Sequence, residues 1–199
     1  SITACIEAGY DLLHIDPTVD RRLPPDTPVP LDTIVERTVA LMRHAESVRR
    51  EMGRGPIAYE VGTEEVGGGL QSDDRFRTFL QQLRSALAAH NLPCPSFVVG
   101  NVGTTLASPA FDAERARRLT AVATSELGAL LKGHYTDDVA HPEQYPLSGM
   151  GGANVGPGLA AVEVDALRAL VALEHRLGAD SGLEAALRSA VVESGRWRK

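Results

Sequence analysis

Residues 96–134 read SFVVGNVGTTLASPAFDAERARRLTAVATSELGALLKGH, and this stretch decides the fold class. A short apolar run at 96–100 precedes residues 112–127, in which apolar side chains recur at helical spacing, and a second apolar run follows at 129–134. Two strands joined through a helix of this length form a βαβ unit, and the strands of such a unit are parallel. The stretch therefore predicts an α/β fold with a parallel sheet.

The same alternation continues on both sides of this stretch. Further strands are expected at 11–16, 57–62 and 153–155, and further helices at 31–52, around 76–87, at 164–177 and at 183–192. Residues 142–152 contain Pro, Gly and Ser and are expected to form an irregular loop. The pattern allows an open doubly wound sheet or part of an eight-stranded barrel. The missing GxGxxG motif after the first strand argues against a dinucleotide-binding fold.

Length, charge and cysteine content restrict the class of protein. With 199 residues, the chain is expected to form one domain over 1–199. Its net charge of −6 argues against nucleic acid as the main partner. Cys5 and Cys94 form no CxxC pattern, which is typical of the reducing cytoplasm, and no apolar run approaches the ~20 residues of a membrane span. Because the chain begins in what reads as a helix end, we expect a piece of a longer polypeptide.

Polar side chains gather where the expected strands end. In a parallel β/α protein these ends converge on one face, which is where active sites lie. The sequence therefore predicts a functional site on this face. The polar side chains at the ends of the five strands are His14 and Asp16, Glu60 and Glu64, Asn101, His134 and Asp137, and Asn154.

Several of these side chains have a purely structural interpretation as well. His14 and Asp16 are two residues apart on a strand, so they point to the same side and could form a hydrogen-bonded pair lining a barrel. Glu60 could form an internal ion pair with Lys132. Glu64 lies in a glycine-rich stretch, where solvated carboxylates are common.

Other polar residues at these ends favour a ligand. His134 has no apolar surroundings in the sequence that would explain it, so it is the best candidate for a metal ligand or an acid/base. Asn154 precedes Gly156, and a glycine there would let the backbone approach an oxygen-rich ligand. The glycines of 66–69 and 100–103 could hold a phosphate through backbone N–H groups.

Several motifs, in order, resemble one known family. They are AGYDLLHID at 8–16, PVPL at 28–31, VGTE at 61–64, GHYTD at 133–137 and VGP at 155–157. Together they cover nearly the whole chain. The chain resembles the Z-subunit family of D-tagatose-1,6-bisphosphate aldolases, which are relatives of the class II ketose-bisphosphate aldolases.

The resemblance implies a (β/α)8 TIM-type barrel of which the first strands, with an early Asp-His segment, precede Ser1. It also implies a divalent metal, zinc in the first instance, and a ketose-phosphate substrate in retro-aldol cleavage or C4 epimerisation. The implied roles are metal binding by His134 and Glu64, proton transfer by Asp16 or Asp137, and substrate binding by Asn154, Gly156, Gly100 and Asn101.

The sequence also departs from the catalytic pattern. Catalytic class II aldolases follow Gly-Asn-Val with a metal-binding His, and this chain has Gly103 there. Loss of that ligand is shared with the Z subunit, which is regarded as non-catalytic, whereas Glu60 and Asn154 match the catalytic enzymes. Two functions remain open: an aldolase or epimerase, or a stabilising subunit that packs on a catalytic aldolase. Self-assembly into a homo-oligomer is the other expected partnership.

Overall fold

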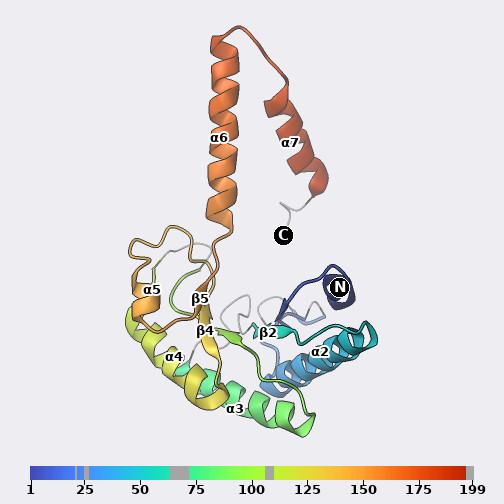
Figure 1. The fold of residues 1–199 in the computed structure, drawn as a ribbon. Helices are drawn as coiled ribbons and strands as arrows, with labels where there is room; N and C mark the ends of the chain where they lie inside the picture. The colour runs from blue at the N-terminus through green and yellow to red at the C-terminus, as the bar shows by residue number, and fades with distance from the viewer. Residues whose placement is uncertain (21, 25–26, 63–71, 106–109, 196–199) are drawn as a thin grey trace. The chain divides into compact units, whose positions relative to one another are not determined.

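A computed structural model describes residues 1–199 except 21, 25–26, 63–71, 106–109 and 196–199 (Figure 1). Contacts between Cα atoms divide the chain into two compact units, Ser1–Asn154 and Val155–Lys199. The first is a β/α unit that contains the strands and the second is a smaller helical unit, while the single domain expected over 1–199 stays a prediction.

The first unit is built on a five-stranded sheet in which every pair of neighbours is parallel, as predicted. The strand order is the order of the sequence, from β1 to β5. A doubly wound sheet reverses its strand order at a switch point, whereas a β/α barrel adds its strands consecutively. The observed order therefore favours the barrel alternative. The strands are β1 (Leu12–Ile15), β2 (Ala58–Val61), β3 (Phe97–Val99), β4 (Leu130–Gly133) and β5 (Gly152–Ala153).

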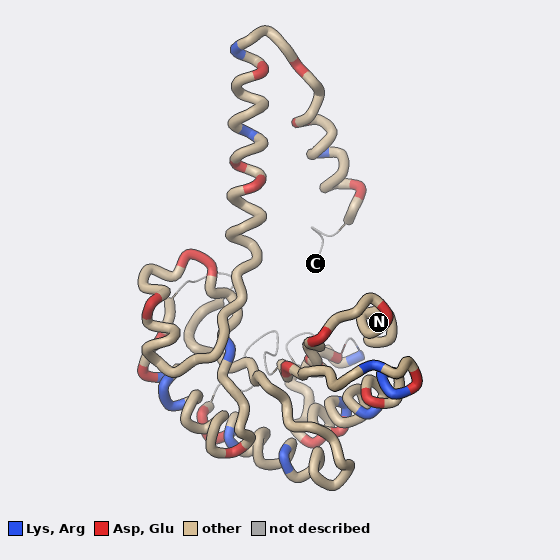
Figure 2. The backbone as a smooth tube through the Cα atoms, in the orientation of Figure 1, with Lys and Arg blue, Asp and Glu red and all other residues tan. Residues whose placement is uncertain are grey.

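Three long amphipathic helices lie side by side along the sheet (Figure 1). Acidic and basic residues are interspersed along these helices (Figure 2), while their apolar positions face the strands. Ser72 and Asp112 cap the second and third of them by accepting from the backbone N–H groups of Arg75 and Arg115. The helices of this unit are α1 (Ile2–Glu7), α2 (Leu31–Glu51), α3 (Asp73–Ala89), α4 (Ala113–Leu127) and the single turn α5 (Gln144–Leu147).

The core lies between the sheet and these helices. Strand residues alternate between the two faces, so Leu13 and Tyr59 point to the helices while His14 and Glu60 point to the opposite face. Large side chains with less than 2% exposure fill the helix side, and apolar burial of this kind supplies roughly 25 cal/mol per Å². The largest of them include Tyr59, Phe76, Phe79, Leu80, Leu83, Leu119 and Leu131.

The connection between β4 and β5 differs from the irregular loop that the sequence predicts. It contains α5, in which Tyr145 is buried and stacks on Phe111 with 4.3 Å between ring centroids. This aromatic contact gives a short polar segment an apolar anchor. The strand after it begins at Gly152, one residue before the expected 153–155, and ends at Ala153.

The second unit consists of α6 (Pro157–Arg176) and α7 (Leu183–Ser194). The first of these begins earlier than the predicted 164, at a proline in the first helical turn, where proline is well tolerated. Leu159, Leu170 and Leu177 in this unit are exposed. Among the described residues, no helix combines the length and the apolar character that crossing a membrane requires.

Candidate metal centre

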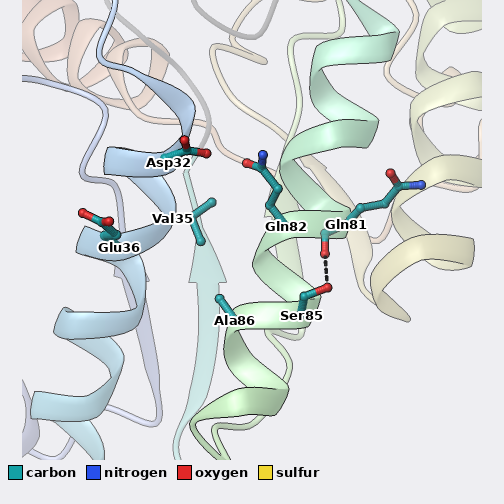
Figure 3. Close-up of a pocket in the computed structure, with 7 residues that line it drawn as sticks. All are labelled: Asp32, Val35, Glu36, Gln81, Gln82, Ser85 and Ala86. Carbon is teal, nitrogen blue, oxygen red and sulfur yellow. Dashed lines mark hydrogen bonds between the residues drawn. The ribbon is translucent and has the colours of Figure 1, made fainter.

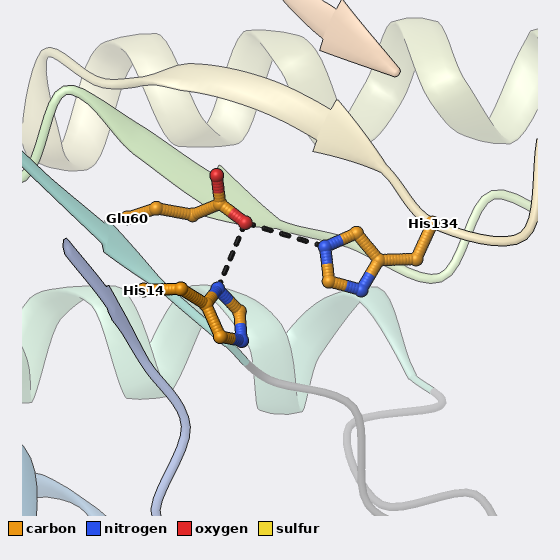
Figure 4. A group of neighbouring side chains, drawn as sticks. All are labelled: His14, Glu60 and His134. Carbon is orange, nitrogen blue, oxygen red and sulfur yellow. Dashed lines mark hydrogen bonds and ion pairs between the residues drawn. The ribbon is translucent and has the colours of Figure 1, made fainter. Parts of the chain in front are cut away.

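Two side chains from strands and one that directly follows a strand meet around one carboxylate oxygen (Figure 4). Glu60 Oε1 lies 2.8 Å from His14 Nδ1 and 3.3 Å from His134 Nε2. His14 is paired in register with Glu60 across β1 and β2, and His134 follows directly after β4. The two imidazole rings are 5.5 Å apart between centroids. We call these three residues the His–Glu–His cluster.

The other oxygen of Glu60 is held by Lys132. Its Nζ lies 2.5 Å from Glu60 Oε2, so the ion pair that the sequence allowed is present. Lys132 is on β4, and its ammonium lies 5.7 Å from the centre of the Phe97 ring. A Cβ atom on Gly152 would come within 3.2 Å of Lys132 Cγ, so the glycine makes room for the lysine stem.

Glu60 is buried and negatively charged. Burial alone would raise the pKa of its carboxyl group, but hydrogen bonds with His134, His14 and Lys132 outweigh burial and hold the pKa well below its usual range. An ionised carboxylate that is only 3% exposed and surrounded by two imidazoles is suited to bind a cation.

Backbone and hydroxyl contacts fix the segment that carries His134. The Thr104 hydroxyl donates to the His134 carbonyl oxygen at 2.6 Å, which ties this segment to the loop after β3. The backbone N–H and hydroxyl of Thr136 donate to the Asn154 carbonyl oxygen at 3.2 and 2.5 Å, and the Asn154 N–H donates to the Gly133 carbonyl oxygen at 2.9 Å. Hydrogen bonds to Thr104 and to Asn154 therefore fix the segment that carries the His134 imidazole.

The donor set fits a divalent transition-metal ion. One ligand atom from each residue of the His–Glu–His cluster lies within 4.8 Å of the others. Two imidazoles and one carboxylate form a usual three-ligand set for zinc and related ions, and they leave a coordination position open. Since Lys132 contacts Oε2, Oε1 is the oxygen that remains for a metal.

The cluster differs from the ligand pair expected from the resemblance. That pair is His134 with Glu64, and Glu64 lies outside the described residues. Among the described residues, the structure brings His14 and Glu60 to His134, and the role predicted for Glu64 stays a prediction. His14 and Glu60 stand out in the sequence as strand-end polar groups, but a structural interpretation accounts for each of them there. The pairing of His14 with Glu60 was not predictable because periodicity does not give the register between strands.

Asp16 lies directly beyond β1 and is not hydrogen-bonded to His14. Its Oδ1 accepts from the backbone N–H of Thr18 at 3.0 Å and from the Thr18 hydroxyl at 2.5 Å. The proposed barrel-lining pair is therefore replaced by two separate contacts, His14 with Glu60 and Asp16 with Thr18. A Cβ atom on Gly62 would lie 2.6 Å from the Asp16 Cβ, so a glycine is needed for this approach.

The expected substrate-binding residues differ in their exposure, in their local contacts and in the unit to which they belong. The Asn101 side-chain oxygen accepts from the Gly103 N–H at 3.0 Å, which commits it to a local turn. Gly100 is buried, and a Cβ atom there would come within 2.7 Å of Leu131, so packing alone explains this glycine. Asn154 is exposed at the end of β5, whereas Gly156 belongs to the second unit.

Asp137 is half-buried and follows His134 in the segment after β4. It therefore lies on the same connection as one histidine of the cluster. Its carboxylate is not among the ligand atoms that gather around Glu60 in the described part of the chain.

Two hollows lie elsewhere. A groove of about 490 Å³ between α2 and α3 is lined by side chains that include Asp32, Glu36 and Gln82 (Figure 3). A second hollow of about 510 Å³ lies between α6 and α7, next to His175 and Arg188. Neither is lined by a residue of the His–Glu–His cluster, and neither brings together a comparable set of metal-binding groups among the described residues.

Solved structures share this fold. A protein of Sinorhizobium meliloti 1021, named a probable tagatose 6 phosphate kinase, is 24% identical with a TM-score of 0.69, over 88% of this chain and 45% of that one. A 2,3-dimethylmalate lyase, a member of the PEP mutase/isocitrate lyase superfamily, is 17% identical with a TM-score of 0.55, over 94% of this chain and 63% of the other.

These similarities identify the fold as that of β/α-barrel proteins. The chain spans about half the length of the first of these proteins and less than two thirds of the second. No model of a known protein family matches the sequence, and no curated protein matches it either.

Proposed function

We propose that this chain belongs to a metal-dependent lyase of ketose-phosphate metabolism. The reaction would be retro-aldol cleavage, or C4 epimerisation, of a tagatose or fructose phosphate or bisphosphate. The observation that carries the proposal is the His–Glu–His cluster at the carboxyl ends of β1, β2 and β4 of the parallel sheet. This end of a β/α barrel is where active sites are built.

The cluster would hold the metal, and zinc is the first candidate. A divalent ion bound by His14, Glu60 and His134 would supply Lewis-acid chemistry toward a substrate carbonyl. Asp16 or Asp137 would take the proton of the hydroxyl group at the cleaved bond. Asn154 would hold a substrate oxygen through its exposed side-chain amide.

Two further points support this class of substrate. The motifs at 8–16 and 133–137, which carry the resemblance to tagatose-bisphosphate aldolase Z subunits, contain His14 and His134 themselves. The names of the two structural neighbours refer to a tagatose phosphate and to a lyase. The chain spans only part of the length of each neighbour. The activity of the whole protein is therefore itself a proposal.

A second candidate function is that of a non-catalytic subunit that stabilises a catalytic aldolase. Gly103 favours it, because the catalytic enzymes have a metal-binding histidine at this position. The backbone of Gly103 has φ +96°, a conformation that a histidine adopts only with strain. The two candidates therefore differ in whether the remaining three ligands suffice for metal binding and turnover.

One experiment separates them. The full-length protein is purified without a partner, its bound zinc is measured, and cleavage and C4 epimerisation of ketose phosphates are assayed before and after removal of the metal by a chelator. The proposal expects bound metal and a turnover that disappears with the metal and returns with zinc. Absence of both metal and turnover, with activity only beside a second subunit, would establish the stabilising role instead.

A further inference from the structure

The two oxygens of Glu60 have different partners. Oε1 lies 2.8 Å from His14 Nδ1 and 3.3 Å from His134 Nε2, and Oε2 lies 2.5 Å from Lys132 Nζ. The lysine is 16% exposed and the glutamate 3%, so water competes little for this ion pair. The carboxylate is thus oriented by a charged partner on the side opposite to the imidazoles.

The different partners of the two Glu60 oxygens affect how this carboxylate could bind a metal. A carboxylate binds a cation through one oxygen or through both. Binding through both would bring a divalent ion beside Oε2 and hence close to the Lys132 ammonium. The ammonium and the doubly charged ion would then repel each other strongly, because little water lies between them to screen two like charges.

The position of Lys132 is determined by its surroundings. Its Cα is paired in register with Gly152 on β5, and any side chain there would press on the lysine stem. On the other side, the ammonium lies 5.7 Å from the centre of the Phe97 ring, close enough for a cation–π contact. Gly152 therefore leaves space for the lysine stem, and Phe97 lies beside the ammonium that pairs with Glu60.

We infer that Lys132 is a positioning residue that restricts Glu60 to one-oxygen binding of the metal. This inference rests on the proposed metal centre and specifies how Glu60 would coordinate the ion there. A set of two imidazole nitrogens and one carboxylate oxygen leaves at least one position for a substrate oxygen in a four-coordinate site. Binding through both oxygens would add a fifth donor once a water or substrate oxygen takes that position, so the lysine keeps the site four-coordinate.

The test uses Co²⁺ in place of zinc in the full-length protein, because the visible absorption of Co²⁺ is intense at four-coordinate sites and falls as the coordination number rises to five and six. Affinity alone is a poor readout, since replacing Lys132 removes both a repulsive charge and an outer partner of a ligand, and such partners contribute about 10- to 100-fold to affinity. Wild type, Lys132→Met and Lys132→Arg are compared, with Arg77→Met as a control, because Arg77 pairs with Glu126 outside the cluster.

Wild type, Lys132→Arg and Arg77→Met are expected to share one intense spectrum, and Lys132→Met to lose absorption several-fold as Oε2 also binds the ion. Equal spectra for Lys132→Met and wild type would overturn the positioning role alone. X-ray absorption of the zinc-loaded wild type provides a test that does not depend on the folding of a variant, and two carboxylate oxygens at bonding distance would also overturn it. Failure of the wild type to bind either ion would overturn the metal centre and the positioning role together.

Discussion

A Cβ atom on Gly103 would overlap the backbone carbonyl oxygen of Ala110. The same Cβ would lie 3.2 Å from the Asp112 backbone nitrogen, which donates to the Val102 carbonyl oxygen at 2.8 Å. With φ at +96°, the turn after β3 accepts glycine for two independent reasons. The backbone of this turn therefore disfavours a histidine at this position. The difference from the catalytic enzymes involves the main chain and is not a simple exchange of side chains.

Replacing Gly103 by histidine should destabilise the protein without strengthening metal binding. A side chain at positive φ costs about 1–2 kcal/mol, and the overlap with Ala110 adds to this. Chemical denaturation and metal titration measure the two effects. Gly128→Ala is the matched control, because Gly128 also has positive φ, at +69°, but a Cβ atom placed on it would meet no other atom within 4 Å. A histidine variant as stable as the control and with tighter metal binding would contradict this prediction.

His134→Ala should abolish metal binding and leave the fold largely intact. His134 contributes Nε2 to the cluster, whereas its segment is held by the Thr104 hydroxyl through the backbone carbonyl, which alanine retains. Affinity should fall more than about 100-fold, since even outer partners of a ligand contribute about 10- to 100-fold. Metal analysis after dialysis and circular dichroism provide the readouts. His44→Ala is the control, because His44 is exposed and contacts Thr3; equal metal content in both variants would remove His134 from the ligand set.

Asp16→Asn should lower turnover by about 10²- to 10⁴-fold, the usual contribution of a general base. Bound zinc should be unchanged, because the Asp16 carboxylate accepts from Thr18 and is not one of the ligand atoms of the cluster. Steady-state kinetics and metal analysis of the same preparation test this, with Asp137→Asn measured in parallel. Normal turnover in Asp16→Asn together with reduced turnover in Asp137→Asn would assign proton transfer to Asp137. Loss of bound zinc in Asp16→Asn would show that Asp16 is a metal ligand.

The parallel sheet was predictable from the sequence, but the pairing that creates the site was not. The expected strand at 57–62 corresponds to Ala58–Val61, because an apolar run between a helix end and a glycine marks a strand locally. That His14 is opposite Glu60 depends on which strands are neighbours and in which register, and neither follows from periodicity. The sequence could therefore suggest the Glu60–Lys132 ion pair, but it did not indicate that His14 contacts the same carboxylate.

Gly103 illustrates a second limit. The resemblance identifies a position where a histidine is missing, but the positive φ and the nearby Ala110 carbonyl depend on how the turn after β3 folds back. The start of α6 illustrates a third limit, because the segment before 164 contains Gly and Pro, which are typical of a loop. Pro157 instead occupies the first helical turn, where a proline costs nothing because its missing N–H would have no helical partner.

A second buried carboxylate lies on the helix side of the sheet, where it has a structural role. Glu46 on α2 is 3% exposed, accepts from the Tyr59 hydroxyl at 2.9 Å and pairs with Arg49 at 2.6 Å. The hydrogen bond from Arg49 lowers the pKa of Glu46 and, with the Tyr59 hydrogen bond and the charge of Arg50, outweighs burial, which acts to raise it. Burial, followed by the contact with Glu46, raises the pKa of Tyr59, which therefore stays a neutral donor.

Glu46→Gln should destabilise the protein by about 2 kcal/mol near neutral pH, because the partly buried Arg49 loses its anion. Since the pKa of Glu46 is lowered on folding from an ordinary value of 4.5, the unfolded chain takes up a proton first as the pH falls. The stabilisation is therefore complete above about that ordinary value and declines below it, so the difference between wild type and variant should shrink in acid. Urea denaturation from pH 7 to 3 measures this, and the exposed Glu114→Gln should change stability by less than about 0.5 kcal/mol throughout. A pH-independent difference for Glu46→Gln would show that its charge does not stabilise the fold.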